Sequence, residues 1–369
     1  MSMRLGIDVS TYLDELKHGA KYFDGEKEVD PLDLFRANGV DIMRIRVWAD
    51  PKSEDGAPYL GGDCDLDNFL RLAKIAQEKG YRIMLDIHYS DFWVDPGKQT
   101  VPKAWKDLSF AELVKKVGSY TVEILNTAKA HGIGIEFIQV GNEITNGMLW
   151  PHARLCGKDG ARTGYENLVQ IIKAGCMGCR AVYPEAKLIL HLERSFDKVV
   201  YNEFFTQMER AQVDYDVIGF SYYPYWHGTF SQFFENAEMC KKFQKELMVV
   251  EVGYAFTLED YIKNEHGGAK LVVSEDNVAT FNFTKEYPVS PEGQARFTRD
   301  FLSLAKEHGI SAVIWWEPLW IPGEGICWAS EAGQKYIGEE GKSTRNEWAN
   351  QCLFGYDQRK MPAFDEFKI

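Results

Sequence analysis

The sequence lacks the features that would place the chain in a membrane, on a nucleic acid or around a zinc cluster. No apolar run reaches the roughly eighteen residues that cross a bilayer, and the N-terminal MSMRLGIDVS contains no apolar signal-peptide segment. Positive charge is in deficit, because the chain has 42 Lys and Arg but 55 Asp and Glu, which gives a net charge of −13. Such a chain repels a phosphate backbone. We expect no membrane and no nucleic-acid partner; the compartment stays open between secretion, after removal of a leader, and the cytoplasm.

Two further absences concern metals and linkers. The seven cysteines are scattered and form no paired CxxC units of a zinc site, and we read Cys176 and Cys179 as two small helix residues. No Pro- or Ser-rich linker divides the 369 residues, so the length fits either one large α/β barrel or two domains. Aromatic residues are abundant, with 10 Trp, 18 Tyr and 22 Phe. We expect some of these rings to face a ligand.

A repeated local pattern predicts the fold. Four helical stretches end in a polar residue (Asn, Lys or His) followed by Gly, at Gly39, Gly80, Gly132 and Gly309, and an apolar run follows each of them directly. Gly just past a helix supplies a left-handed cap, and the apolar run is typical of a buried parallel strand. Eight strands are predicted in all, in the segments 5–10, 40–48, 81–89, 133–143, 186–193, 215–224, 247–256 and 310–318.

Eight alternating strand and helix units predict an α/β fold, a single (β/α)8 TIM barrel spanning residues 1–369. Asp65, Ser109 and Ser290 are the expected N-caps of three of the helices. A doubly wound sheet is the rival, but the first strand is followed by GIDVSTYLDEL, which has no glycine-rich phosphate turn. Long insertions follow strand ends at 89–108, 143–164, 254–289 and 318–345, where barrel loops form a substrate cleft.

Polar residues at the carboxyl ends of barrel strands converge on one site. The strand ends deliver Arg44, Arg46, Asp86, His88, Asn142, Glu143, His191, Glu193, Tyr222, Tyr223, Glu251, Trp315, Trp316 and Glu317. Two carboxylates about 5–5.5 Å apart perform retaining glycoside hydrolysis, in which one protonates the leaving oxygen and the other attacks the anomeric carbon. Glu143 and Glu251 are placed to form such a pair, with Arg44 and Tyr222 as donors to Glu251 and the Asn142 amide as a partner for a sugar 2-hydroxyl.

Each of these residues also has a purely structural interpretation. Glu251 alone would suit a salt bridge, and Arg44 or Arg46 an ion pair within the barrel mouth. His88 would suit a core histidine with satisfied hydrogen bonds, and Trp316, Trp150 and Trp320 would suit packing. The joint arrangement is much less common than any one member, and it favours catalysis.

Several segments together resemble glycoside hydrolase family 53, the endo-β-1,4-galactanases of the retaining (β/α)8 clan A. They are RIRVWADP (44–51), GGDCDLD (61–67), LDIHYSDFWVDPGKQ (85–99), PKAW (102–105), VGNEITNGMLWP (140–151), GFSYYPYWHG (219–228), EYPVSPEGQ (286–294) and WWEPLWIP (315–322). The similarity runs from the first strand to the last.

The resemblance implies a role for each matching position. Glu143 would be the acid/base and Glu251 the nucleophile of a double displacement that cleaves β-1,4-galactan or type I arabinogalactan, the galactose side chains of pectin. The supporting residues would be Arg44, His88, Asn142, Trp316 and Tyr222 or Tyr223. The substrate-binding residues would be Asp91, Trp93, Trp150, Tyr223, Trp226, His227 and Trp320.

The chain departs from the family pattern in three places, one of which is the Val252-Gly253 that follows Glu251. Members often carry a calcium-binding run after strand seven, but Glu259, Asp260, Asn264 and His266 in TLEDYIKNEHGGAK do not keep its alternating spacing. A structural calcium is therefore doubtful, and we expect no cofactor, no catalytic metal and a monomer. Strand five ends with Glu193 and Arg194, where the family usually has a small or amide residue, so we expect altered subsite preference.

Three alternatives stay open at this point. One is a clan relative that acts on another β-1,4-glycan or on galacto-oligosaccharides. The second is a non-catalytic sugar-binding barrel, which predicts a missing or misplaced carboxylate. The third is a metal-dependent barrel hydrolase built on Asp86 and His88, although the His-x-His signature is absent.

Overall fold

Eight parallel strands close into a barrel in the computed structural model, which describes residues 3–157, 162–262, 268–278 and 283–368. The strands are hydrogen-bonded in the order β1, β12, β11, β10, β9, β6, β5, β4 and back to β1. Their bounds are β1 Arg4–Asp8, β4 Val40–Val47, β5 Arg82–Ile87, β6 Ile135–Val140, β9 Lys187–Leu192, β10 Val217–Tyr222, β11 Glu246–Val252 and β12 Ala312–Trp316. The predicted (β/α)8 barrel is confirmed, and the doubly wound sheet is wrong.

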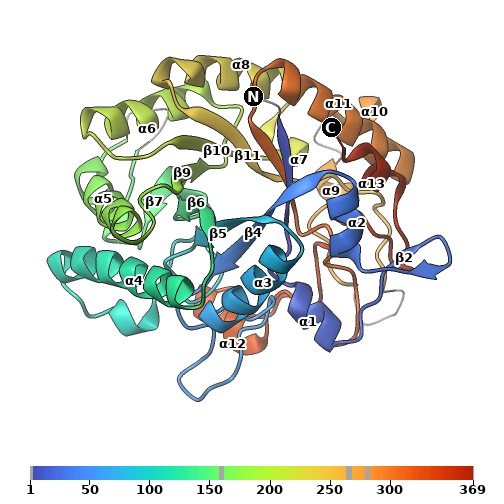
Figure 1. Ribbon diagram of the computed structural model, residues 1–369, viewed down its shortest axis with the longest axis horizontal. Helices are drawn as coiled ribbons and strands as arrows, with labels where there is room; N and C mark the ends of the chain where they lie inside the picture. Colours follow the sequence, from blue (N-terminus) through green and yellow to red (C-terminus); the bar gives the residue numbers. More distant parts are fainter. Residues whose placement is uncertain (1–2, 158–161, 263–267, 279–282, 369) are drawn as a thin grey trace.

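Helices surround the barrel on all sides (Figure 1). The long ones are α3 Leu66–Glu78, α4 Phe110–Ala130, α5 Tyr165–Val182, α6 Lys198–Arg210, α8 Phe230–Cys240 and α11 Pro291–Glu307. The short ones are α1 Tyr12–Lys17, α2 Pro31–Ala37, α7 Pro224–His227, α9 Glu275–Val278, α10 Phe283–Glu286, α12 Glu331–Ile337 and α13 Pro362–Glu366. The predicted N-caps Asp65, Ser109 and Ser290 each accept a backbone N–H of the first turn. These caps fix where the helices begin.

The barrel interior has two layers of different chemistry. Near the strand starts it is filled by apolar side chains, namely Ile42, Met84, Phe137, Ile189, Val217, Met248, Val250, Ala312 and Ile314. Gly6 of β1 lies among them, where an added Cβ would stand 2.5 Å from Ile314 Cδ1 and 2.9 Å from Ile42 Cβ. No larger residue fits there. Because side chains alternate along a strand, the next inward positions form a second layer, at the carboxyl ends.

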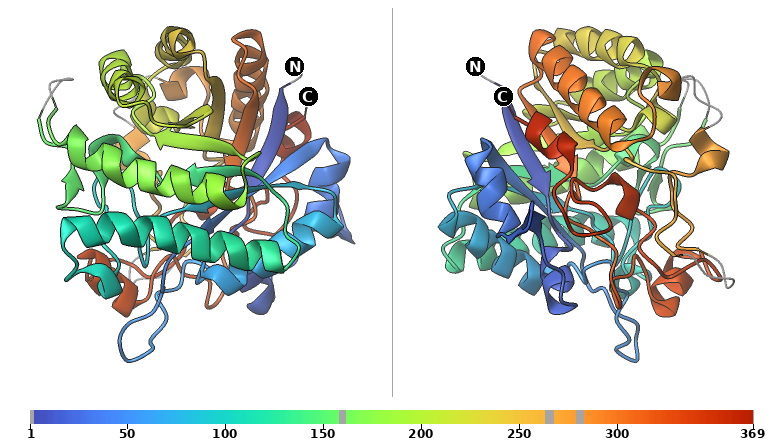
Figure 2. Two further views of the ribbon diagram at one scale, coloured as in Figure 1. Left: turned by 60° about the vertical axis from the view of Figure 1, so that its left-hand side comes forward. Right: turned by 90° about the vertical axis from the view of Figure 1, so that its right-hand side faces the viewer.

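Long loops extend from the carboxyl ends of the strands, as the sequence predicts. They carry two small hairpin-like sheets, β2 Phe23–Asp24 with β3 Lys27–Glu28 and β7 Gly147–Met148 with β8 Ala153–Arg154. The two chain ends lie close together at the opposite end of the barrel, where the strands begin (Figure 2). Among the described residues no helix has both the length and the apolarity to cross a membrane.

Candidate active site

The second interior layer is polar, and almost every strand contributes to it. Its members at the carboxyl half of the barrel are Asp8, Arg44, Asp86, Gln139, His191, Ser221 and Glu251, each from a different strand. All are at most 6% exposed. Buried polar groups at this density require mutual hydrogen bonds and ion pairs. The contacts of this layer position the two candidate catalytic carboxylates.

Glu251 reaches the barrel interior through a β-bulge. Val249 of β11 is paired with Phe220 of β10, but the next pair is Glu251 with Ser221, so that Val250 is an extra residue. Strict alternation would turn Glu251 outward after the inward Val250; the bulge turns it inward instead. Its Oε1 lies 2.9 Å from Arg44 Nη2, and its Oε2 accepts the Tyr223 hydroxyl at 2.9 Å.

Glu143 lies just beyond the end of β6 in the left-handed backbone conformation, with φ of 47° and ψ of 50°. Its Oε1 accepts a hydrogen bond from Ser221 Oγ at 2.6 Å. Ser221 Oγ is in turn 2.8 Å from His191 Nε2, which must donate because the hydroxyl proton is already committed. Burial and the charge of Arg44 lower the pKa of His191 well below its usual value, so the ring is neutral.

The two carboxylates differ in their electrostatic surroundings. Burial and then the neighbouring charges of Glu251 and Glu193 raise the pKa of Glu143 well above its usual value. Burial also raises the pKa of Glu251, to about 7, but Arg44 and the Tyr223 hydroxyl oppose that rise. Within the part of the chain that the structure describes, no Lys or Arg forms an ion pair with Glu143. Glu251 is therefore the carboxylate that ionises first, and Glu143 is the one that keeps its proton.

Arg44 joins the Glu251 carboxylate to the polar layer beneath it. Its guanidinium contacts Asp8 at 2.7 Å and Asp86 at 2.8 Å, besides Glu251 and the Asn142 Oδ1 at 3.0 Å. It is thus both an internal ion pair and a support for Glu251, and the two interpretations of the sequence merge. Asp86 Oδ2 also forms a hydrogen bond with His88 Nε2, at 2.9 Å. Asp86 is therefore engaged by Arg44 and His88, and the other ring nitrogen of His88 accepts the Trp48 indole N–H at 3.2 Å, which does not fit the half-site of a metal hydrolase.

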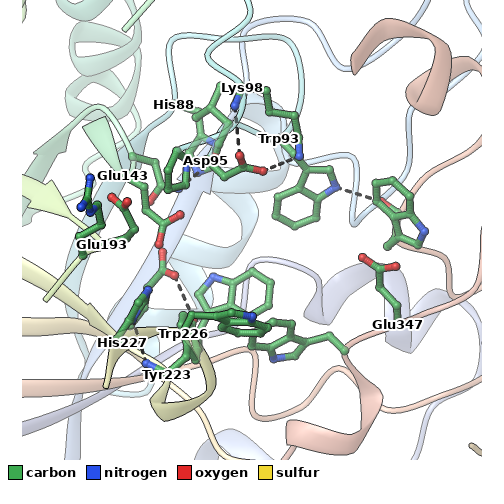
Figure 3. A pocket seen from close by; sticks show the side chains of 18 of the residues that line it. His88, Trp93, Asp95, Lys98, Glu143, Glu193, Tyr223, Trp226, His227 and Glu347 are labelled. Carbon is green, nitrogen blue, oxygen red and sulfur yellow. Dashed lines mark hydrogen bonds and ion pairs between the residues drawn. The ribbon is translucent and has the colours of Figure 1, made fainter. Parts of the chain in front are cut away.

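A cavity of about 650 Å³ opens above this layer, within the range of ligand sites. Figure 3 shows Glu143, Glu193 and His227 on one side of it, and Trp93, Lys98 and Glu347 further along. The complete lining is His88, Trp93, Val94, Asp95, Pro96, Lys98, Asn142, Glu143, Glu193, Arg194, Phe196, Tyr223, Trp226, His227, Glu251, Trp316, Trp320, Trp328, Glu339, Lys342, Glu347 and Trp348. Both carboxylates thus face one cavity, contrary to the non-catalytic interpretation.

Indole rings form much of the cavity wall. Trp93, Trp316 and Trp320 have ring centroids about 6 Å apart. The buried guanidinium of Arg46 lies 4.4 Å from the Trp93 ring and 5.6 Å from the Trp316 ring, and is held by Glu317 at 2.6 Å. Arg46 thus fixes the rings from behind by cation–π contact. Flat apolar faces of this kind stack on the C–H faces of sugars.

Most of the predicted site residues meet at this cavity. Glu143, Glu251, His88, Asn142, Trp316, Trp93, Tyr223, Trp226, His227 and Trp320 line it, and Arg44 lies directly beneath Glu251. Trp226 is 37% exposed, whereas His227 is buried and accepts the Tyr223 backbone N–H at 3.1 Å.

Three predicted residues lie elsewhere. Tyr222 does not contact Glu251, because strand alternation turns it toward the helices, where its hydroxyl donates to the Gly228 carbonyl and its ring stacks on Phe301 at 5.0 Å. Tyr223 makes the contact instead. Asp91 is buried beside the loop backbone and accepts the Lys103 N–H at 2.8 Å. Trp150 stacks on Arg154, 4.1 Å from its guanidinium, and does not line the cavity.

The sequence interpretation missed residues of two kinds. Ser221 is the partner of Glu143, and the alternation from Val217 inward could have revealed it. The loop residues Asp95, Lys98, Phe196, Trp328, Glu339, Lys342, Glu347 and Trp348 also line the cavity. No local pattern identifies these, since their position depends on contacts between loops far apart in the chain.

The absence of a structural calcium stays a prediction. Asn264 and His266 lie outside the described residues. Asp260 uses its carboxylate to accept the backbone N–H groups of Ile262 at 2.8 Å and Lys270 at 3.3 Å. Within the described ranges no group of three or more His, Cys, Asp or Glu side chains is arranged to hold a metal ion.

Known proteins resemble this chain over nearly its whole length. Residues 4–367 match glycosyl hydrolase family 53. An endo-beta-1,4-galactanase of Bacillus subtilis (strain 168) is 30% identical, over 98% of this chain and 85% of that protein. An uncharacterized protein of Niallia circulans is 34% identical, over 99% and 93%. The solved GH53 catalytic domain of Ignisphaera aggregans superposes with a TM-score of 0.85 at 34% identity, over 99% of this chain and 95% of that one.

Proposed function

The chain belongs to glycoside hydrolase family 53, and from this premise we propose that it is an endo-β-1,4-galactanase acting on galactan or type I arabinogalactan. The relatives named above support the substrate, since one of them is an endo-beta-1,4-galactanase. The single observation that supports the mechanism is the unequal environment of the two carboxylates, with Arg44 against Glu251 and only Ser221 against Glu143.

In the proposed mechanism Glu251 is the nucleophile and Glu143 is the acid and then the base. Glu251, ionised beside Arg44, attacks the anomeric carbon and forms a covalent galactosyl-enzyme. Glu143, protonated in its buried position, donates that proton to the departing glycosidic oxygen. In the second step Glu143 is a carboxylate, takes a proton from water, and the resulting hydroxide displaces Glu251 with net retention. Asn142, which lines the cavity, would bond the sugar 2-hydroxyl in this mechanism.

Product analysis tests this proposal. The protein is incubated with potato β-1,4-galactan, with xylan and with mannan, and the products are identified by chromatography and by NMR of the first-formed anomer. We expect galacto-oligosaccharides with retained β configuration. Preferential cleavage of xylan or mannan would move the activity to another β-1,4-glycan, and inverted product would refute the double displacement.

Two variants separate the roles of the carboxylates. Both Glu143→Gln and Glu251→Gln should lose galactan hydrolysis by roughly 10²–10⁴-fold or more. An aryl galactobioside, whose leaving group needs no protonation, should restore formation of the galactosyl-enzyme in Glu143→Gln and not in Glu251→Gln. Near-wild-type turnover of galactan in either folded variant would refute the assignment.

A further inference from the structure

The cavity continues well away from the catalytic carboxylates. Figure 3 shows Glu143 and Glu193 at one end of the pocket, Glu347 at the other, and Trp93 between them. Glu347 belongs to the long segment after β12, and its carbonyl accepts the Val272 N–H at 2.9 Å, which anchors that segment to the loop after β11. At the far end of the cavity the segment after β12 is therefore held to the loop after β11 by a backbone hydrogen bond.

The side chain of Glu347 is half-buried and has no hydrogen-bond or ion-pair partner in the described parts of the chain, although it lines the cavity. Glu339 at the same end differs, because its carboxylate pairs with Lys98 at 3.0 Å and with Lys342 at 2.8 Å. Burial raises the pKa of Glu347 to about 7. An unpaired, partly desolvated carboxylate is costly unless a ligand satisfies it.

The ion pairs around Glu347 keep this end of the cavity in place. Lys98, from the loop after β5, bridges to Glu339 of the segment after β12 and also pairs with Asp95. Lys98 and Lys342 therefore form ion pairs with Asp95 and Glu339, and neither forms one with Glu347. Trp328, which donates its indole N–H to the Ser343 carbonyl at 2.5 Å, lines the same region. The far end thus offers one acceptor carboxylate and an aromatic face.

The positions of the catalytic residues give the direction of the bound chain. The leaving-group oxygen must lie next to the acid Glu143, so the departing sugar occupies the side of Glu143 and Glu193. The sugar attacked by Glu251, and the units linked beyond it, extend in the opposite direction. That direction leads past Trp93 to Glu347.

We propose that Glu347 binds vicinal hydroxyls of the last glycone unit that the cavity admits, and so makes the enzyme favour longer chains. Two neighbouring hydroxyls of a galactosyl unit can each donate to one carboxylate oxygen, while Trp328 borders the sugar. This inference rests on the proposed function in assuming a β-1,4-linked glycan in the cavity. Charge-assisted hydrogen bonds of this kind are the strong ones.

The experiment measures kcat/KM for Glu347→Gln and Glu347→Ala on β-1,4-galacto-oligosaccharides of increasing length. Glu340→Gln is the matched control, since Glu340 is exposed in the same segment and does not line the cavity. With the longest chains we expect a loss of about tenfold for Glu347→Ala, arising in KM rather than in kcat. The loss shrinks as the chain becomes too short to reach Glu347. Thermal unfolding of Glu347→Gln should show no loss of stability, because that change keeps the size of the side chain and removes no hydrogen bond or ion pair among the described residues.

The outcomes distinguish this inference from the proposed function. If wild type prefers xylo- or manno-oligosaccharides, galactanase activity is refuted, and the same comparison on the preferred series still decides the role of Glu347. If the losses are equal at every chain length, or if Glu340→Gln shows the same profile, the role of Glu347 is refuted while the activity stands. If wild type acts on no β-1,4-linked series, both are refuted.

Discussion

The hydroxyl of Tyr223 provides a sensitive test of how Glu251 is kept ionised. Tyr223→Phe removes one hydrogen bond of 2.9 Å to Glu251 Oε2 and leaves the ring, which packs edge-on against Trp348 at 5.2 Å and Trp226 at 5.9 Å. The substitution therefore creates no cavity. Arg44 remains on the other carboxylate oxygen, 2.9 Å away.

The size of the effect follows from the strength of that bond. A hydrogen bond to a charged group contributes about 1.5–3 kcal/mol, and one pKa unit corresponds to about 1.4 kcal/mol. Tyr223 lowers the pKa of Glu251 against the larger effect of burial, so its removal should raise that pKa by about 1 unit. Because Glu251 must be ionised to attack, the acidic limb of kcat/KM moves to higher pH by the same amount. On the plateau we expect a loss of about tenfold or more.

The assay is the pH dependence of kcat/KM on a soluble galactan, with Tyr222→Phe as the matched control. The neighbouring Tyr222 hydroxyl donates to the Gly228 carbonyl at 3.0 Å, outside the cavity. Its loss should cost about 1 kcal/mol of unfolding free energy and leave the pH profile in place. A shifted acidic limb in Tyr222→Phe, with an unshifted limb in Tyr223→Phe, would refute the reasoning.

Two further substitutions should move the basic limb, which reports the acid Glu143, in opposite directions. The Ser221 hydroxyl, 2.6 Å from Glu143 Oε1, lowers the pKa of Glu143. Ser221→Ala removes this donor and raises that pKa, so the basic limb should move to higher pH while kcat falls. Glu193→Gln removes a charge that raises the pKa of Glu143, so the basic limb should move to lower pH. The pKa of Glu193 itself is about 7 in the folded protein. Its ionisation therefore destabilises the fold as pH rises from about 4.3 to 7, and Glu193→Gln should raise Tm more at pH 8 than at pH 5. An equal change in Tm at both values would contradict this.

The strands and several helix ends were predictable because local signals specify them. The left-handed glycines after the helices, such as Gly80 with φ of 76°, and N-caps such as Ser109 act within a few residues. The strand pattern placed Glu143 and Glu251 near the carboxyl ends of two strands, and the structure has them near the ends of β6 and β11.

The remaining errors have physical causes that a linear pattern does not contain. Choosing between Tyr222 and Tyr223 required the inward register of β10, and the inward turn of Glu251 depends on a bulge that places one extra residue, Val250, against its partner strand. Asp91 resembles a binding residue in the sequence, yet its carboxylate accepts a hydrogen bond from the Lys103 backbone N–H. Glu347 becomes a candidate only when the loops after β5, β11 and β12 are placed together.

The tryptophan lining of the cavity also gives the protein an internal optical probe. Of its ten tryptophans, six line the cavity, namely Trp93, Trp226, Trp316, Trp320, Trp328 and Trp348. A glycan that displaces water from these rings changes the environment of most of the emitting indoles at once. Intrinsic fluorescence therefore reports occupancy without a label, and Trp226, 37% exposed, is the ring that a bound chain would most protect from an aqueous quencher.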